Sequence, residues 1–374
     1  MTTICHVLDR TTGWQQRLGI SHLLDRLGAG SHRQRIIALH RNASDALAPG
    51  STSTEQAYSP VESNWVSAAI LRRTLRQGPF DLIHAWGAEA AWAAVTATAG
   101  LIPLLVTLYH PALTNAQRKR LRLLTTRATA GFICPTGIVR RRLIEAGIAP
   151  ESCVVVRPGV DFALINAVRR GDLRRRLGLP ESALAIALPD PIPGGHCARE
   201  AILAVALREY LEPGPCVVIP AACTAARAIQ RFASNMPHSY ILVTAPADIR
   251  YEELLSVCDV LIVTTPGDVS TTAISWAMAC GAGVVASAVP AVAELITHQV
   301  NGLLYKRRKG GNAATIAHLL EQQDLPSRCR EVARGQAYEV FSIRRFAQQH
   351  EQAYANMIDR VPVGEGIVDP AMVG

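Results

Sequence analysis

Short apolar segments recur along the whole chain, and helical patterns separate each one from the next. They are rich in β-branched residues and have the length of buried strands: 3–8, 35–39, 81–85, 104–109, 131–134, 153–156, 184–188, 216–219, 240–244, 259–264, 283–286 and 302–305. Strands of this kind alternating with helices indicate parallel sheets that are covered by helices on both faces. The sequence therefore predicts an α/β fold.

The 374 residues are too many for one ordinary core, and the strands divide evenly between two halves. We expect an N-terminal Rossmann-like unit at 1–170, completed by an amphipathic helix at 342–357, and a second unit at 175–338. Residues 358–374 are expected to form a flexible tail. Doubly wound sheets bind ligands beyond the carboxyl ends of their strands, so the cleft between the two units is the expected site.

Composition indicates an ordinary globular protein, with 49% hydrophobic and 18% charged residues. The chain shows no secretory signal and no apolar run of the ~20 residues that cross a membrane, so we expect a cytoplasmic protein. Its nine cysteines lie singly, without CxxC pairs or Cys/His clusters. We therefore expect reduced thiols, no metal site and no bound cofactor.

The net charge of +8 comes with four basic clusters, at 118–122, 140–142, 174–176 and 306–309. Each could be a solvated face or turn, or could attract the phosphates of a nucleotide or an anionic lipid surface. Nucleic acid is disfavoured because no aromatic residues interleave with the charges. A dinucleotide-dependent oxidoreductase is also disfavoured, because no GxGxxG follows a strand.

Several segments, in order, resemble those of one enzyme family. They read TTGWQQRLGISHLLDRLGAG, FDLIHAWGA, LLVTLYHP, GIVRRRLIEAGIAPESCVVVRPGVDFALI, YEELLSVCDVLIVTTPGD, AMACGAGVVAS and VAELITHQVNGLLY. The chain resembles the retaining glycosyltransferases of GT-B type that use nucleotide sugars, the group 1 or RfaB-like family. The resemblance implies two Rossmann-like units that face each other. It also implies metal-independent transfer of a hexose with retained anomeric configuration.

The same resemblance implies positions for the reacting groups. Asp268 matches the first of two glutamates that bind the donor in the family, and it would hold the sugar hydroxyls. His110 follows the strand that ends in T-x-H and would orient the sugar. Gly13 lies in the opening loop, where it would let the backbone approach a phosphate or an acceptor.

The donor site departs from the family pattern. The second glutamate falls on Trp276, whose N–H can donate but cannot accept the ribose hydroxyl protons. Trp276 could therefore either stack on the donor, as a donor-binding residue, or pack inside the protein. The basic pair of the family falls within LPDPIPGGHCARE, which leaves Arg199, on the following helix, as the nearest arginine. Ser270, as N-cap, with Thr271 and Thr272 at the helix start could partly compensate by binding an anion.

Two functions therefore stay open at this point. One is an active glycosyltransferase in polysaccharide biosynthesis, with a glycan or lipid-linked acceptor. The alternative is a catalytically silent relative that serves as a binding or scaffold protein in polysaccharide assembly. The run NAQRKRLRLLTTR further suggests peripheral contact with the inner face of a membrane through Arg118, Lys119, Arg120 and Arg122. The competing interpretation of that run is a solvated helix whose leucines pack inward.

Overall fold

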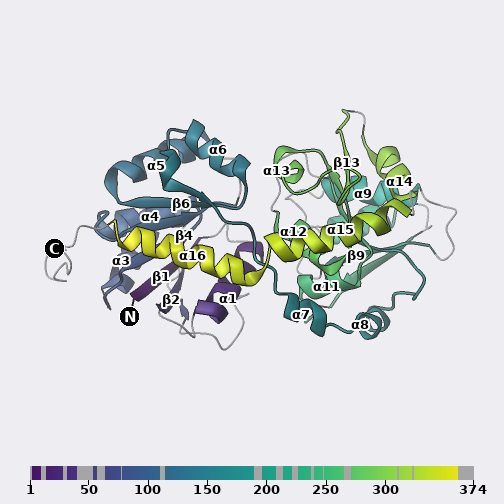
Figure 1. Ribbon diagram of the computed structural model, residues 1–374, viewed down its shortest axis with the longest axis horizontal. Coiled ribbons are helices and arrows are strands. Elements are labelled where there is room, and N and C mark those ends of the chain that lie inside the picture. The colour runs from purple at the N-terminus through teal and green to yellow at the C-terminus, as the bar shows by residue number, and fades with distance from the viewer. Residues whose placement is uncertain are drawn as a thin grey trace. The chain divides into compact units, whose positions relative to one another are not determined.

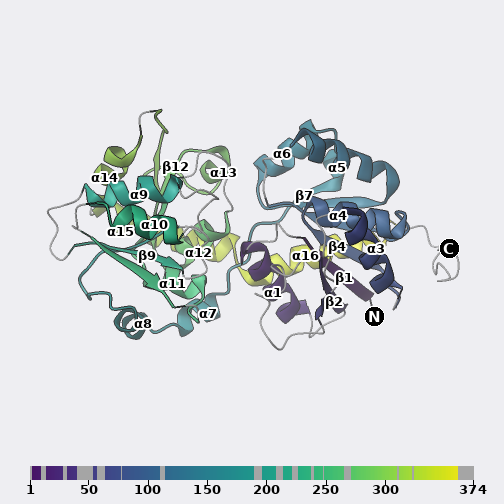
Figure 2. The same cartoon turned by 180° about the vertical axis from the view of Figure 1, so that it is seen from behind.

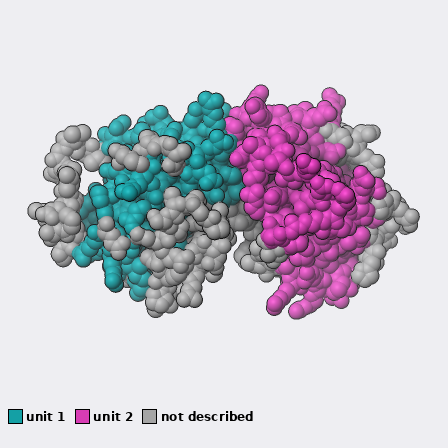
Figure 3. Space-filling model, turned by 90° about the horizontal axis from the view of Figure 1, so that it is seen from below, with its two compact units in different colours: residues 1–159, 343–374 teal, residues 160–342 magenta. Residues whose placement is uncertain are grey.

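The computed structural model describes residues 2–9, 14–27, 32–39, 54–56, 64–76, 78–109, 114–188, 196–207, 214–220, 226–236, 240–246, 248–264, 271–309, 311–321 and 324–360. The chain divides into two compact units, Met1–Gly159 with Ile343–Gly374, and Val160–Ser342 (Figure 3). The division falls about ten residues before the boundary expected from the sequence. Most of the expected tail, 361–374, lies outside the described residues.

The first unit is built on a seven-stranded parallel sheet (Figure 1). Its strand order is β3-β2-β1-β4-β5-β6-β7. The strands are β1 (Thr2–Leu8), β2 (His32–Ala38), β3 (Thr54–Gln56), β4 (Leu82–Trp86), β5 (Leu104–Thr107), β6 (Ala130–Cys134) and β7 (Cys153–Val155). The helices are α1 (Trp14–Leu27), α3 (Asn64–Leu75), α4 (Ala88–Thr98), α5 (Asn115–Arg127), α6 (Gly137–Glu145) and α16 (Ile343–Ile358). The sequence missed the edge strand β3, whose polar residues form no apolar run.

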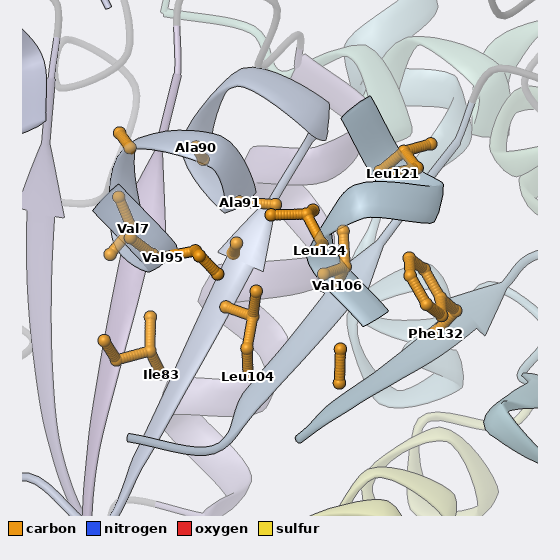
Figure 4. Close-up of a cluster of buried hydrophobic side chains, with 14 of the residues drawn as sticks. Val7, Ile83, Ala90, Ala91, Val95, Leu104, Val106, Leu121, Leu124 and Phe132 are labelled. Atoms are coloured by element: carbon orange, nitrogen blue, oxygen red, sulfur yellow. The ribbon is translucent and has the colours of Figure 1, made fainter. Parts of the chain in front are cut away.

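Each face of this sheet carries its own core. On one face, alanines of α4 and leucines of α5 pack on inward residues such as Val106 and Phe132 (Figure 4). On the other face, α1 and the C-terminal helix α16 cover the sheet through residues such as Leu23, Phe346 and Tyr354. The last helix of the chain therefore completes the first unit.

The second unit carries a six-stranded parallel sheet in the order β10-β9-β8-β11-β12-β13 (Figure 2). The strands are β8 (Ala185–Ala187), β9 (Cys216–Pro220), β10 (Ile241–Ala245), β11 (Val260–Val263), β12 (Gly283–Ser287) and β13 (Leu303–Tyr305). The helices are α7 (Phe162–Ala167), α8 (Arg170–Arg176), α9 (His196–Ala206), α10 (Ala226–Ala233), α11 (Tyr251–Val257), α12 (Thr272–Cys280), α13 (Pro290–Ala293), α14 (Ala313–Glu321) and α15 (Asp324–Val340). In both units the strand order reverses once, which confirms the predicted doubly wound α/β architecture.

None of the helices in the described part of the chain combines the length and the apolarity needed to cross a bilayer. The cysteines that the structure describes are all unpaired thiols, and all but the half-buried Cys280 are buried.

Candidate functional site

The reversal of strand order in the second unit lies between β8 and β11. In a doubly wound sheet this is the place where ligands bind, beyond the carboxyl ends of the strands. Thr264 follows β11 directly, and Thr271 and Thr272 begin the next helix, α12. Two predicted site residues between them, Asp268 and Ser270, lie outside the described residues. His110 and Gly13 of the first unit lie outside them as well.

Thr271 is the N-cap of α12, one residue later than the sequence predicted. Its side chain makes no capping hydrogen bond, and its fully buried Oγ1 has no hydrogen-bond partner among the described residues. The carbonyl of Thr271 accepts hydrogen bonds from both the backbone N–H and the hydroxyl of Ser275, each at 2.9 Å. The first turn of a helix has free N–H groups that attract anions, and an unsatisfied hydroxyl there adds a further donor.

Trp276 lies in the middle of α12 and is 0% exposed. Every residue from Thr272 to Ala279 is buried, so the helix lies inside the unit on all its sides. Gly281 then ends it in the left-handed conformation, with φ of 77°. The burial favours a packing role for Trp276. A role for Trp276 in stacking on the donor stays a prediction.

Arg199 on α9 has a partner within the second unit. Its guanidinium carbon lies 5.5 Å from the centroid of the Phe232 ring on α10, at cation–π distance. The described geometry therefore directs Arg199 towards α10. Its role as a donor-binding residue also stays a prediction.

A different cation reaches the carboxyl end of β11. Arg307 follows β13, and its Nη1 donates to the carbonyl of Thr264 and lies 3.3 Å from Oε2 of Glu200 on α9. The other oxygen of Glu200 accepts the backbone N–H and the side-chain amide of Asn312, at 2.8 and 2.6 Å. The sequence marked Arg307 only as part of a basic cluster, and Glu200 carried no signal at all.

Asp9 is a buried acid at the corresponding edge of the first unit, directly after β1, and no pattern in the sequence marked it as a site residue. Its Oδ2 accepts the backbone N–H of Ala90 at 3.2 Å, in the first turn of α4. Gly87, before this helix, has φ of 130°, and a Cβ there would lie 2.3 Å from the carboxylate. Asp9 and Gly87 therefore fix the start of α4 together.

Beneath this edge lies a buried network of aromatic and histidine side chains. The indole N–H of Trp86 donates to His6 Nδ1 at 3.0 Å, so the Nε2 of His6 carries the proton that reaches Gln34 Oε1 at 2.9 Å. His84 bridges Thr107 and Tyr354, at 2.7 and 2.9 Å. The network therefore joins β1, β2, β4 and β5 to the C-terminal helix.

These histidines are held neutral by their surroundings. Burial lowers the pKa of His6 and of His350 to about 4, and it holds the pKa of His84 well below 6.5. A second charge on a neighbouring histidine lowers the pKa of His84 further. The described residues contain no group of three or more His, Cys, Asp or Glu side chains placed to hold a metal ion.

The basic clusters have different environments. On α5, Arg118, Lys119, Arg120 and Arg122 are all exposed. Leu121 and Leu124 are fully buried and Leu123 is 38% exposed, so two of the three leucines face the core. Arg174, in contrast, is buried and donates to the carbonyls of Val257, Pro180 and Ala183. Arg174 is therefore structural, and the phosphate-binding interpretation of its cluster is wrong for this residue.

An open hollow of about 520 Å³ lies between α7, α8 and α11 of the second unit. Its charged side chains are largely paired, Arg176 with Asp248 and Arg250 with Glu253. We assign it no ligand, because two of its three lining arginines, Arg176 and Arg250, are already paired within the unit.

Two family models match the chain. The model described as Glycosyltransferase Family 4 matches residues 19–164, and the model described as Glycosyl transferases group 1 matches residues 215–322. Together they span about two thirds of the sequence. Comparison with curated proteins finds no match.

Solved structures share the fold over nearly the whole chain at low sequence identity. HepE from Anabaena, in complex with UDP-glucose, has a TM-score of 0.76 at 18% identity, over 95% of this chain and 100% of that one. A glycosyltransferase from Rickettsia africae has a TM-score of 0.76 at 16% identity, over 96% and 99%. WaaG, a glycosyltransferase involved in lipopolysaccharide biosynthesis, has a TM-score of 0.70 at 14% identity, over 98% and 100%.

Proposed function

We propose, on the premise that this chain belongs to the group 1 glycosyltransferases of family 4, that it transfers a hexose from a nucleoside diphosphate sugar to a glycan or lipid-linked acceptor. The transfer retains the anomeric configuration and uses no metal ion. The observation that carries the proposal is at the start of α12, beside the strand-order reversal, where the buried hydroxyl of Thr271 has no hydrogen-bond partner among the described residues. The first turn of a helix also presents backbone N–H groups that attract anions.

In this proposal the second unit binds the donor. The amides and hydroxyls of Thr271 and Thr272 bind the diphosphate, and Asp268 accepts hydrogen bonds from the sugar hydroxyls. As the bond to the sugar breaks, negative charge grows on the departing diphosphate. Donors fixed in advance at a helix N-terminus stabilise that charge without reorganising.

The first unit binds the acceptor in this proposal. His110 follows β5 and orients the sugar that is transferred, and Gly13 admits the acceptor or a phosphate close to the backbone. Polysaccharide assembly is the process that would use such a transfer. The proposal also includes contact of α5 with a membrane, since four exposed cations on one helix attract an anionic lipid surface.

UDP and UDP-glucose are the first ligands to test, because the Anabaena relative was crystallised with UDP-glucose. Isothermal titration with uridine, guanosine and adenosine diphosphates should find saturable binding for at least one. Slow release of that nucleotide from its sugar donor, measured without acceptor, would then show that the donor bond is broken. Asp268→Asn should abolish this release, while Asp248→Asn, at an exposed ion pair, should leave it unchanged.

The silent alternative also has an observation in its favour. Trp276 occupies the position of the second donor-binding glutamate and is completely buried. Absence of binding by all three nucleoside diphosphates at millimolar concentration would support a scaffold function and contradict the enzyme.

A further inference from the structure

Arg307 reaches across the sheet instead of remaining at the end of its own strand. It lies two residues beyond β13, and β12 separates β13 from β11 in the sheet. Its Nη1 nevertheless donates to the carbonyl of Thr264, at the carboxyl end of β11. Its guanidinium is therefore beside the place where the strand order reverses.

The network around Glu200 holds this guanidinium in place. Glu200 lies on α9 with 15% of its side chain exposed, and it joins Arg307 to Asn312 at the start of α14. The helices α9 and α14 pack side by side on one face of the sheet (Figure 1). Asn312 in turn accepts the backbone N–H of Arg308 at 2.8 Å. The cation is thus positioned before any ligand arrives.

Most of the donors of Arg307 remain available. Its contacts with Glu200 and Thr264 both use Nη1, and within the described part of the chain Nε and Nη2 have no hydrogen-bond partner. The side chain is 34% exposed. A guanidinium has five N–H donors in a planar fork, and the pair on Nε and Nη2 matches two oxygens of a phosphate.

The local charge is also positive. Lys306, Arg308 and Lys309 flank Arg307, are exposed, and have no ion-pair partner among the described residues. Among the described residues, Glu200 is the one acid that pairs with the run 306–309. An anion that approaches the carboxyl end of β11 therefore meets a net positive field.

We infer that Arg307 binds a phosphate of the nucleoside diphosphate donor, in place of the basic pair that the chain lacks after β8. The inference rests on the proposed function for the class of the ligand. Thr271, at the start of α12, would supply a second donor to the diphosphate through its hydroxyl, which has no hydrogen-bond partner in the described part of the chain. The cation that binds the phosphate would thus lie after β13 in this chain, whereas the basic pair of the family lies between β8 and α9.

The test compares Arg307→Gln with Lys309→Gln. The second variant removes the same charge from the same run, at an exposed side chain with no ion-pair partner among the described residues. Titration with the nucleoside diphosphate that the wild type binds, and with inorganic diphosphate, measures the dissociation constants. Loss of a charge-assisted contact should weaken both ligands about tenfold to a hundredfold in Arg307→Gln. The free nucleoside should bind unchanged, and Lys309→Gln should stay within about twofold.

Arg307→Lys covers the case in which Arg307→Gln fails to fold by circular dichroism. It keeps the charge but loses the fork, so diphosphate binding should weaken about threefold to tenfold. A wild type that binds a nucleoside diphosphate, with an Arg307 variant that binds it equally well, overturns this inference and leaves the proposed function standing. A wild type that binds no diphosphate overturns both.

Discussion

Trp86 donates its indole N–H to Nδ1 of His6 at 3.0 Å, in the buried layer between the sheet of the first unit and its last helix. A proton cannot be added to Nδ1 while this donor faces it. The contact therefore fixes the tautomer of His6 and excludes its charged form. Together with His84 and His350, it makes the first unit depend on neutral histidines.

The stability of the first unit should fall as the pH falls below 6.5. The pKa of His6 and of His350 is lowered to about 4 by burial, so the unfolded chain takes up protons before the folded one. As the pH falls from 6.5 to 4, each of these two histidines should lower the free energy of unfolding by about 1.4 kcal/mol per pH unit. His84 acts in the same direction. Urea titrations at several pH values would measure this, with tryptophan fluorescence in Trp276→Phe to report on the first unit alone.

The matched variants for this prediction are His350→Gln and His318→Gln. His350 is fully buried, whereas the side chain of His318 is 71% exposed. His350→Gln should reduce the pH dependence by about one proton, and His318→Gln should leave it unchanged. Equal slopes for all three proteins would contradict the neutral-histidine interpretation.

Trp86→Phe should destabilise the first unit even at neutral pH. The substitution removes part of the indole ring together with its N–H, so Nδ1 of His6 loses its donor in a site without solvent. A buried group left unsatisfied costs about 1–3 kcal/mol. The variant should also raise the pKa of His6, since the N–H that opposes protonation is gone, and nuclear magnetic resonance titration of the ring protons would detect that change.

Trp276 should behave as a core residue. Trp276→Ala should lower the free energy of unfolding by about 3–5 kcal/mol, because the ring is completely buried. Trp276→Glu should destabilise the second unit at least as much, because it would bury a carboxylate in a position built around an apolar ring. Trp276→Phe should keep diphosphate affinity within about twofold. A large loss of affinity in a folded Trp276→Phe protein would instead favour the ligand-stacking role.

Arg174 and Arg175 are neighbours in sequence with opposite environments. Arg174→Met should lower the free energy of unfolding by about 2–4 kcal/mol, because it removes the donor that Arg174 supplies to the carbonyls of Val257 and Ala183. Arg175→Met should change it by less than about 0.5 kcal/mol, since the Arg175 side chain is 81% exposed. Chemical denaturation of both variants checks the contrast.

The exposed basic face of α5 should bind anionic membranes. Changing Arg118, Lys119, Arg120 and Arg122 to Gln together should reduce co-sedimentation with anionic liposomes and leave the low binding to neutral liposomes unchanged. The control variant changes four exposed arginines elsewhere to Gln, which removes the same total charge. These are Arg227, Arg231, Arg328 and Arg344. If the two variants pellet equally, net charge alone explains the binding, and this result would contradict a membrane-binding face on α5.

Much of the fold could be predicted because its signals are local. The strands predicted at 81–85 and 283–286 depend on apolar residues a few positions apart, and both are confirmed as β4 and β12. The edge strand β3 was missed, because a polar three-residue strand at a sheet edge needs no apolar pattern. The start of α12 was predicted one residue early, because serine is the stronger N-cap by local preference, whereas Thr271 occupies the N-cap position without a capping hydrogen bond.

The candidate site was harder to predict because its members are distant in sequence. Glu200, Thr264 and Arg307 meet only after three strands and two helices have packed, and no spacing connects them. The buried Asp9 was missed for the same reason, since its partner lies at the start of α4.

By itself the sequence determined the parallel α/β architecture and the family, since both follow from apolar periodicity and from short motifs in a set order. The tertiary structure alone decided which of several similar side chains became buried, paired or available. Arg174 is enclosed while Arg175 is exposed, and Arg307 is anchored while Lys309 is not. The physical reason is that burial and hydrogen bonding depend on which distant segments come into contact, and the local sequence around each arginine carries no record of that.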